Sequence, residues 1–481
     1  MRNRVAIGAG AVVALATGLV ELVSSHSLRY AFGALIAGAL AAAIVWFVST
    51  LPGLTLRGLV TGGFFVLAGM ASWTYTDTGK GLIWGVLAAE GIVFAWWSWP
   101  WLRDLPPLPR LGTAWLGLAY WLLGIVGALL VGAWTVGAQR IAYAGVFGLA
   151  VLTVVAGVRR DRGRDLSVGI AGSFLLAIAA LFLSGAGNLF KHRHVVPHNG
   201  WGTEVMVHRF WGGKWLMYHP NSLALIAVVI ATRIGVDRAF AVWQRLTVTL
   251  LAGGVVYLTN SRTGFVYFAA AAVVHGYALL RRHGAGLPSY RRVWVAVAVP
   301  LVIAALVGAV SEASGQGFLF KARYNAGDPT SGRTASWKQV GQEWLHGNVV
   351  QKAFGDTATS RAVVRRNNMD LTTDNAAVGA LRRGGVLGEL AFLLGLGLLL
   401  WRSWRGYGSG DARRAAPAWL LVTAVGSVPT IATADWLLGG TGGTLWILLV
   451  AGEAWLVLGP READGGSRAP IDSGQVPVGL G

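Results

Sequence analysis

Long hydrophobic runs recur along almost the whole chain and are separated by short polar turns. Most runs have about 17 to 22 residues, so each one, as a helix, is long enough to cross the roughly 30 Å apolar core of a bilayer. The pattern predicts an all-α polytopic integral membrane protein with about 14 transmembrane helices, in a range of about 12 to 14. The expected spans are residues 5–23, 30–49, 55–75, 82–100, 112–135, 140–158, 166–186, 219–235, 244–259, 263–280, 293–311, 385–401, 416–432 and 439–458.

Two longer polar stretches divide this pattern into regions. The expected regions are N-terminal transmembrane helices in 1–186, a loop in 187–218, central transmembrane helices in 219–311, a large loop in 312–384, C-terminal transmembrane helices in 385–459 and a tail in 460–481. The tail is rich in Gly, Pro, Ser and Asp, which predicts disorder. The first hydrophobic run is followed closely by others, so it is expected to be a span and not a cleaved signal.

Basic residues alternate between the turns in a way that predicts the orientation of the spans. Lys and Arg in short loops keep those loops on the cytoplasmic side. Every second turn after Arg2 and Arg4 is rich in Arg, as in the group at 159–164. The turns between them carry few basic residues, namely Arg29, Lys80, Arg140 and Arg262. We therefore expect cytoplasmic termini, with both long loops and the turn at 260–262 on the external side.

Composition narrows the possible chemistry. Of the 481 residues, 54% are hydrophobic and 13% are charged, which excludes an ordinary soluble domain. The formal net charge of +19 is explained by the basic turns, so we expect no nucleic-acid partner. The chain has no Cys, which excludes disulfides, thiolate metal sites and thiol catalysis. The nine His residues lack metalloprotease spacing, and neither a metal nor a cofactor is expected.

The first polar stretch ends in a group of candidate binding residues. Arg209 and Lys214 precede the sequence His219-Pro220-Asn221, after which an apolar run begins. Pro at the first position of a helix is favourable, so this sequence is compatible with a plain helix start. The functional alternative is that Arg209 and Lys214 lie above a cavity at membrane level, with Asn221 offering its amide to a ligand or to another loop.

The turn Asn260-Ser261-Arg262 separates two apolar spans. A charge at that depth is unfavourable unless it is paired or faces a polar cavity, so Arg262 indicates an anionic partner. The alternative is that the Arg262 side chain snorkels: its aliphatic part stays in the apolar region while its guanidinium contacts lipid phosphates.

The large loop carries a second candidate arginine. Arg333 lies four residues before Trp337, so both are expected on one face of a helix. The planar guanidinium suits a diphosphate, because it donates two parallel hydrogen bonds and keeps its charge. The loop also holds nine other basic residues, and most of these are expected on a solvated or headgroup-facing surface. The nine are Lys321, Arg323, Lys338, Lys352, Arg361, Arg365, Arg366, Arg382 and Arg383.

The pair Asp374-Asn375 precedes another apolar run. One interpretation is a helix cap, since the side-chain oxygens of Asp and Asn accept hydrogen bonds from free N–H groups at a helix start. The other is that Asp374 is a general base that takes a proton from an acceptor hydroxyl. The two interpretations are compatible.

Taken together, these features resemble the O-antigen ligase and O-antigen polymerase superfamily of bacterial membrane glycosyltransferases. The resemblance covers roughly residues 209–400: an Arg and a Pro-Asn pair, a Thr-x-Ser-Arg-x-Gly turn, a large loop with Arg and Trp, and paired glycines. Ligases of the family carry His, a polar residue such as Asn, nine residues, Gly, two residues and Gly. Asn375, Gly385 and Gly388 fit that spacing, but Asp374 takes the place of the His, as in polymerase-like members.

The resemblance implies a GT-C-like fold and a metal-independent reaction at the external face of the bacterial cytoplasmic membrane. A glycan would pass from a polyprenyl diphosphate carrier, undecaprenyl or decaprenyl, to a hydroxyl of an acceptor glycan or glycolipid among the membrane lipids. Arg262, Arg333 and Arg209 would bind the diphosphate, with Arg333 and Asp374 catalytic. The accompanying motif residues would be Asn375, Gly385, Gly388, Asn221, His219 and Trp337.

A transporter of an anion or of the lipid-linked glycan is the main alternative, because Glu90 and Glu389 lie inside apolar runs. Transporters usually bind near the bilayer midplane between repeated halves, whereas these basic residues gather at one face and no repeat is evident. A non-enzymatic assembly partner is a third possibility. The sequence leaves ligase and polymerase, which differ only in the acceptor, both open.

Overall fold

The structure is a computed structural model of the chain. It describes residues 28–71, 112–160, 164–185, 193–195, 205–207, 220–237, 239–283, 333–356, 363–366, 369–372, 375–408, 415–428 and 443–458, with single positions such as 210, 218 and 431. The predicted spans 5–23, 82–100 and 293–311 and the predicted tail 460–481 lie wholly or mostly outside these residues, as does Glu90.

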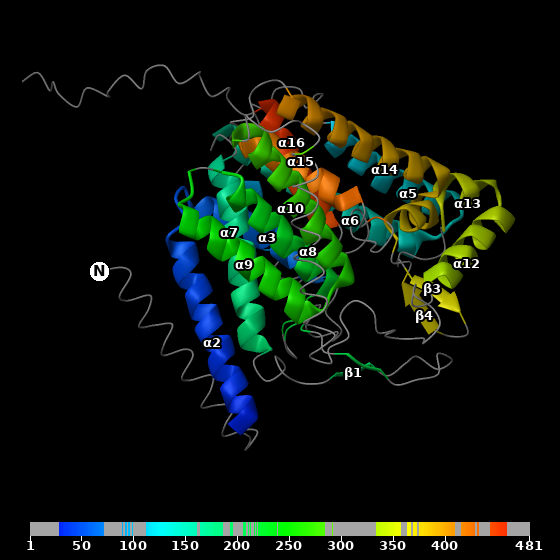
Figure 1. Ribbon diagram of the computed structural model, residues 1–481. Coiled ribbons are helices and arrows are strands. Elements are labelled where there is room, and N and C mark those ends of the chain that lie inside the picture. Colours follow the sequence, from blue (N-terminus) through cyan, green and yellow to red (C-terminus); the bar gives the residue numbers. More distant parts are fainter. Residues whose placement is uncertain are drawn as a thin grey trace, which may run out of the picture.

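Helices make up most of the described chain, as predicted (Figure 1). They are α2 (Leu28–Ser49), α3 (Leu56–Ala71), α5 (Gly112–Leu130), α6 (Trp134–Arg160), α7 (Arg164–Ser184), α8 (Pro220–Gly235), α9 (Val242–Thr259), α10 (Arg262–His283), α12 (Arg333–His346), α13 (Val349–Phe354), α14 (Ala376–Gly408), α15 (Ala415–Ser427) and α16 (Gly443–Leu458).

Two small antiparallel hairpins add strands that the sequence pattern did not predict. The first pairs β1 (Arg193–Val195) with β2 (Val205–Val207). The second pairs β3 (Val363–Arg366) with β4 (Met369–Thr372), with Val363 opposite Thr372 and Arg366 opposite Met369. Both hairpins fall in the two polar stretches, so the transmembrane prediction is not affected by them.

Four of the described helices are long and apolar enough to cross a membrane. They are Phe32–Ser49, Gly112–Leu130, Leu166–Ser184 and Ala376–Gly406, and the shorter apolar helix Pro220–Gly235 accompanies them. The chain is thus a membrane protein by length and composition of its helices. The count of about 14 spans stays a prediction.

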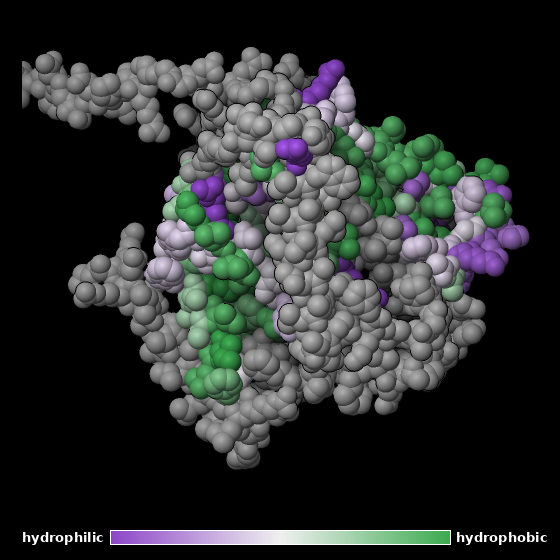
Figure 2. Space-filling model, viewed as in Figure 1, coloured by the Kyte–Doolittle hydropathy of each residue, from purple (hydrophilic) through white to green (hydrophobic). Residues whose placement is uncertain are grey.

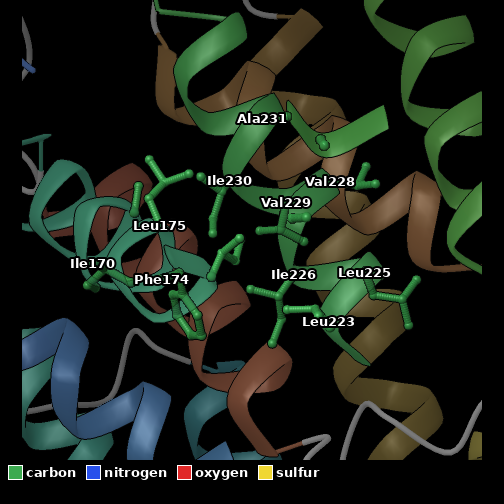
Figure 3. Close-up of a cluster of buried hydrophobic side chains, with 14 of the residues drawn as sticks. Ile170, Phe174, Leu175, Leu223, Leu225, Ile226, Val228, Val229, Ile230 and Ala231 are labelled. Carbon is green, nitrogen blue, oxygen red and sulfur yellow. The ribbon is translucent and has the colours of Figure 1, made fainter. Parts of the chain in front are cut away.

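Helix α8 forms the centre of the packing. It is apolar on all sides and nearly every one of its residues is buried, which is expected of a helix surrounded by other helices. Figure 3 shows Leu223, Ile226 and Ile230 on the side of α8 toward α7, where Ile170, Phe174 and Leu175 lie, and Leu225 and Val228 on its other side. Helices α9, α10 and α15 also contact α8, while α2 and α3 cover the other side of α7.

A second group of helices packs beside this centre. Helix α14 lies against α5, which in turn packs against α6, and α16 contacts both α6 and α15 (Figure 1). The outer surface of α14 is apolar, with Leu390, Leu393 and Leu394 about half exposed. Figure 2 shows hydrophobic residues along this surface and hydrophilic ones near α12 and α13. Such a band is the surface that a bilayer would cover.

A buried arginine joins α7, α8 and α16. Arg233 is 1% exposed, donates from Nε to Ser167 Oγ at 2.8 Å and from Nη1 to Asp237 Oδ2 at 3.0 Å. Its guanidinium lies 4.6 Å from the ring centroid of Trp455. These contacts satisfy a charge that is unfavourable in a buried position without partners.

The span predicted to begin at residue 385 starts at the kink of α14 and not at the first residue of this helix. The helix begins at Ala376, so residues 376–384 of the predicted loop 312–384 belong to it. A kink at Gly385, with φ 61° and ψ −162°, divides its 33 residues into two parts. The part after the kink, residues 386–408, is about 34 Å long at 1.5 Å per residue, which is enough to cross the apolar core of a bilayer. Hydropathy missed the first turns because they contain Arg382 and Arg383.

Substitution of Gly169 tests the close crossing of α3 and α7. A Cβ at Gly169 would lie 2.3 Å from the Cα of Gly58, so the backbones must separate in Gly169→Ala. We expect a loss of about 1–3 kcal/mol in the free energy of unfolding, as overpacking typically causes. Thermal unfolding in detergent measures it.

The matched control for this substitution is Gly145→Ala in α6, where an added Cβ meets nothing within 4 Å. Ala has the better helix propensity, so this variant should be neutral or slightly more stable. Equal stability of the two variants would contradict the close crossing.

Candidate functional site

The first candidate residues meet where α8 and α10 begin. Asn221 is the second residue of α8, and its Oδ1 accepts a hydrogen bond from Ser261 Oγ at 2.9 Å. The same hydroxyl accepts the N–H of Gly264 at 3.0 Å, which makes Ser261 the N-cap of α10. The structure therefore joins Asn221 to the Asn260-Ser261-Arg262 turn, two segments that the sequence placed on the same predicted side.

The turn itself is tight. Asn260 ends α9 in the left-handed region, with φ 47° and ψ 46°, a conformation that Asn tolerates better than most residues. A Cβ at Gly264 would lie 2.5 Å from the Cβ of Ala224, so α10 passes α8 too closely for a side chain there. The Thr-x-Ser-Arg-x-Gly pattern thus has a structural reason at Ser261 and at Gly264.

Arg262 is the first residue of α10 and is half-buried, between the fully buried Ser261 and Thr263. The first turn of α10 contains no acidic residue. The positive end of the helix dipole lies beside the positively charged guanidinium at this point, and each of them favours the binding of an anion. The neighbouring polar groups Asn221 and Ser261 hold each other, so the framework around Arg262 is fixed by uncharged hydrogen bonds.

The first polar stretch approaches the same turn. The N–H of Phe210 donates to the carbonyl oxygen of Leu258 at 2.8 Å, and its ring stacks on Phe182 with the centroids 5.1 Å apart. Phe210 follows Arg209 directly in the chain, but Arg209 itself lies outside the part that the structure describes. His219, just before α8, is likewise not among the described residues.

Asn375 is the N-cap of α14. Its Oδ1 accepts the N–H of Val378 at 3.0 Å, and its carbonyl oxygen accepts that of Gly379 at 2.8 Å. The N–H of Ala376 donates to the carbonyl oxygen of Ile431, beyond α15, at 2.8 Å. The cap interpretation therefore holds for Asn375. Asp374 lies outside the described chain, so its role as a base stays a prediction.

The paired glycines of α14 allow two close contacts. Gly385 has φ 61° and ψ −162° and interrupts the helix with a kink. A Cβ there would lie 2.4 Å from the backbone of Ala353, so the end of α13 packs directly on the kink. A Cβ at Gly388 would approach the ring of Tyr120 to 3.3 Å, which places α5 against the next turn. Both glycines serve packing in the described structure.

The start of α12 carries the second candidate arginine, Arg333, together with Trp337. Arg333 is the first residue of α12, and Trp337 follows it within the same helix and is half-buried. Helix α12 contacts α14 and the hairpin of β3 and β4. Its Lys338 is exposed, as expected for the surface of the loop.

Two basic residues of the predicted loop are not on a solvated surface. Arg382 and Arg383 belong to the group of which most members were expected on a solvated or headgroup-facing surface, but each is only 7% exposed. Arg383 Nε donates to the hydroxyl of Tyr120 at 2.8 Å, and Arg382 pairs with Asp356 at 3.4 Å. They face the protein because the helix begins before them and turns them toward α5 and α13.

Helix α15 links the two groups of candidate residues. Tyr267 of α10 donates its hydroxyl to the carbonyl oxygen of Thr423 in α15 at 3.1 Å. The start of α14 is fixed to Ile431, just beyond the same helix. Thus α10, which carries Arg262, and α14, which follows Asn375, are both held by α15. Among the described residues, no group of three or more His, Asp or Glu side chains is arranged to hold a metal.

Replacement of Ser261 tests the junction of α8 and α10. Ser261→Ala removes both the cap of α10 and the hydroxyl that bonds Asn221, and we expect it to lower the free energy of unfolding by about 1–3 kcal/mol. Thr249→Ala is the control, because its exposed hydroxyl bonds only to a carbonyl of its own helix. Its effect should stay within about 0.5 kcal/mol. Equal losses in chemical unfolding would contradict this account of the junction.

Comparison with known proteins bears on the central part of the chain. Residues 247–346 match the family model described as O-antigen ligase. The match includes Arg262, Arg333 and Trp337 and ends before Asp374 and the paired glycines. None of the curated proteins compared with the chain matches it. The resemblance that the motifs predicted is confirmed by the family match, over a shorter range than residues 209–400.

Proposed function

We propose that the chain, whose residues 247–346 match the family model described as O-antigen ligase, transfers glycan from a polyprenyl diphosphate carrier to an acceptor hydroxyl. The observation that carries the proposal is the position of Arg262, inside the matched range. It opens a helix without acidic residues in its first turn and lies on a framework of buried polar groups.

The proposed reaction needs a site that stabilises a departing diphosphate. The acceptor oxygen forms a bond to the anomeric carbon while the bond from that carbon to the diphosphate oxygen breaks. The electron pair leaves with the polyprenyl diphosphate, whose growing charge Arg262 and Arg333, with Arg209, would stabilise by charge-assisted hydrogen bonds. The proton of the acceptor hydroxyl passes to Asp374 as general base.

The remaining motif residues have supporting roles in this proposal. Asn375 caps α14 and so fixes the residue that follows Asp374 in the chain. Asn221 bonds to Ser261 next to Arg262 and so holds the turn that carries the guanidinium. His219 and Trp337 are proposed to line the acceptor side. Gly385 and Gly388 allow the close packing that the loop requires.

The proposed setting is the bacterial cytoplasmic membrane, with both termini cytoplasmic and the site on the external side. The alternation of basic turns supports this orientation. The partners are the lipid-linked glycan, an acceptor glycan or glycolipid, and the surrounding lipids. A donor in the membrane also suits a site built at the ends of apolar helices.

Loss of the Arg262 guanidinium should abolish transfer. In vesicles with purified protein and a synthetic polyprenyl-diphosphate oligosaccharide, we expect Arg262→Ala to lower turnover by about 100-fold or more. Arg262→Lys should recover part of it, because Lys keeps the charge but not the planar fork. A second donor molecule and a glycolipid serve as alternative acceptors, and mass spectrometry of the product identifies which is used.

The control for Arg262 is Arg405→Ala, near the other end of α14, where the exposed guanidinium lies 4.4 Å from the ring centroid of Trp401. It should transfer like the wild type. Equal activity of Arg262→Ala and Arg405→Ala would reject a diphosphate site at Arg262.

In cells, Arg333→Ala should separate an enzyme from a transporter. At matched protein levels in the membrane, we expect externally exposed polyprenyl-diphosphate glycan to accumulate and the larger glycan product to disappear. Selective labelling of exposed donor provides the measurement. Donor trapped on the cytoplasmic side would indicate a transporter of the lipid-linked glycan, and unchanged pools would remove Arg333 from the mechanism.

A further inference from the structure

The turn between α12 and α13 carries strongly exposed apolar side chains. Leu345, near the end of α12, is 60% exposed, and Val349, the first residue of α13, is 82% exposed. We call residues 344–352 the tip, and both of its helices lie at the edge of the described molecule (Figure 1). Single exposed apolar residues are common on protein surfaces. What these two contact therefore depends on where the tip lies relative to the bilayer.

The packing of α13 places its end beside a membrane span. Helix α13 contacts both α5 and α14. The buried Arg140 guanidinium donates to the carbonyl oxygen of Gly124 in α5 and to that of Asp356, just after α13, so these two residues lie close to the same level. Gly124 is six residues before the end of the candidate span Gly112–Leu130, or about 9 Å along the helix axis. The end of α13 is thus at membrane depth.

The kink of α14 leads to the same depth. A Cβ at Gly385 would lie 2.4 Å from the backbone of Ala353, so α13 packs directly on the kink. The exposed apolar surface of α14 begins just after it, at Val386. Helix α13 has six residues and is about 9 Å long. Its first residue, Val349, therefore lies no farther from the bilayer centre than roughly the end of α5 at Leu130.

The neighbouring turn between α5 and α6 is also apolar. Leu130 is 61% exposed and Trp134 is 70% exposed. Trp is enriched at the interface between membrane and water, because its ring is apolar and its N–H is polar. The tip thus continues an apolar surface that already exists at the end of a membrane span.

Polar groups of the tip bond to one another. Asn348 Oδ1 accepts the N–H of Gln351 at 2.9 Å, and Gln351 Oε1 accepts the N–H of Asn348 at 3.1 Å, which forms a reciprocal cap. Trp344 Nε1 donates to the carbonyl oxygen of Lys352 at 3.1 Å, and the N–H of Gly347 donates to that of Trp344 at 3.2 Å. Backbone that enters a bilayer needs such internal partners, because hydrocarbon offers none.

We propose that the tip is a lipid anchor. Leu345 and Val349 insert among the acyl chains of membrane phospholipids, at the boundary between headgroups and hydrocarbon. Helices at this boundary bury their apolar side by about 5–10 Å, which agrees with the depth of α13. Lys352 extends its aliphatic part along the boundary and its ammonium group toward the headgroup phosphates.

The anchor holds one end of α12, the helix that begins at Arg333, at the membrane surface. Part of the stretch 312–384, predicted as an external loop, then lies in lipid and not in water. This inference goes beyond glycan transfer and does not depend on it, because contact with lipid is measurable without any reaction.

Spin labels measure whether the tip is in lipid. The chain has no Cys, so Leu345→Cys and Val349→Cys each carry one label. In phospholipid vesicles, power saturation compares collisions of the label with oxygen, which dissolves in hydrocarbon, and with a water-soluble nickel chelate. We expect an oxygen-to-chelate ratio at both positions that is several-fold higher than at a water-facing position of the same helix.

Two labelled controls bracket this measurement. Glu343→Cys is the water-facing control, because Glu343 is exposed and lies two residues before Leu345, on the opposite side of α12. Leu394→Cys is the lipid-facing control, on the exposed apolar surface of α14. Ratios at 345 and 349 as low as at 343 would overturn the proposal. Low accessibility to both reagents, with spin–spin broadening between molecules, would also overturn it and indicate a second copy of the chain.

A charge at the tip provides a second test. Val349→Asp leaves Asn348 and Gln351 in place and alters a side chain that is 82% exposed, so the fold should persist. A carboxylate resists transfer into hydrocarbon, and we expect the ratio of a label at Leu345→Cys to fall to that at Glu343→Cys. An unchanged ratio at 345 in this variant would contradict the anchor.

Discussion

Inside a membrane protein, a charged or backbone polar group that leaves water needs its partners within the protein, because the hydrocarbon offers none. The described structure meets this requirement with a few long-range contacts. Arg233 bonds Ser167 and Asp237, and Arg140 bonds two carbonyls from separate segments. Glu453 of α16, fully buried, accepts from Arg402 of α14 and from Thr113 of α5. Each buried charge thereby fixes the relative position of two or three helices. Apolar packing alone specifies these positions weakly in a membrane, because lipid tails are as apolar as the helix surfaces.

The sequence predicted the helices better than their contacts. Hydropathy placed α8, α9 and α10 within a few residues of their observed ends, because each is an apolar run bounded by a clear polar turn. It missed the turns of α14 that precede the kink at Gly385, since Arg382 and Arg383 look like loop residues in a one-dimensional profile. Their burial depends on hydrogen bonds with Tyr120 and Asp356. A local sequence pattern cannot predict a hydrogen bond between residues as far apart as 120 and 383.

In the candidate site too, the sequence indicated which residues matter but not which contacts they make. The basic turns predicted that the segments of Asn221 and Ser261 lie on one side of the membrane, and Asn221 was expected to offer its amide to a ligand or to another loop. The 2.9 Å hydrogen bond between Ser261 and Asn221 is a specific contact that the sequence did not predict. The paired glycines were recognised by spacing alone. Their physical reason, the approach of Ala353 and Tyr120 to α14, needed three-dimensional information. The family match covers neither Arg140 nor the glycines, so the N-terminal helices contribute contacts that the matched range does not contain.

The contact between Arg140 and Asp356 also has a consequence for synthesis. The two residues are separated by 216 positions in the chain. At about 5 to 20 residues per second, the ribosome needs roughly 10 to 40 seconds to make the segment between them. During that time the Arg140 guanidinium sits between helices α5 and α6 without the carbonyl that it later binds. The nascent chain must therefore keep this charge hydrated, or in contact with the insertion machinery, until α13 and α14 arrive.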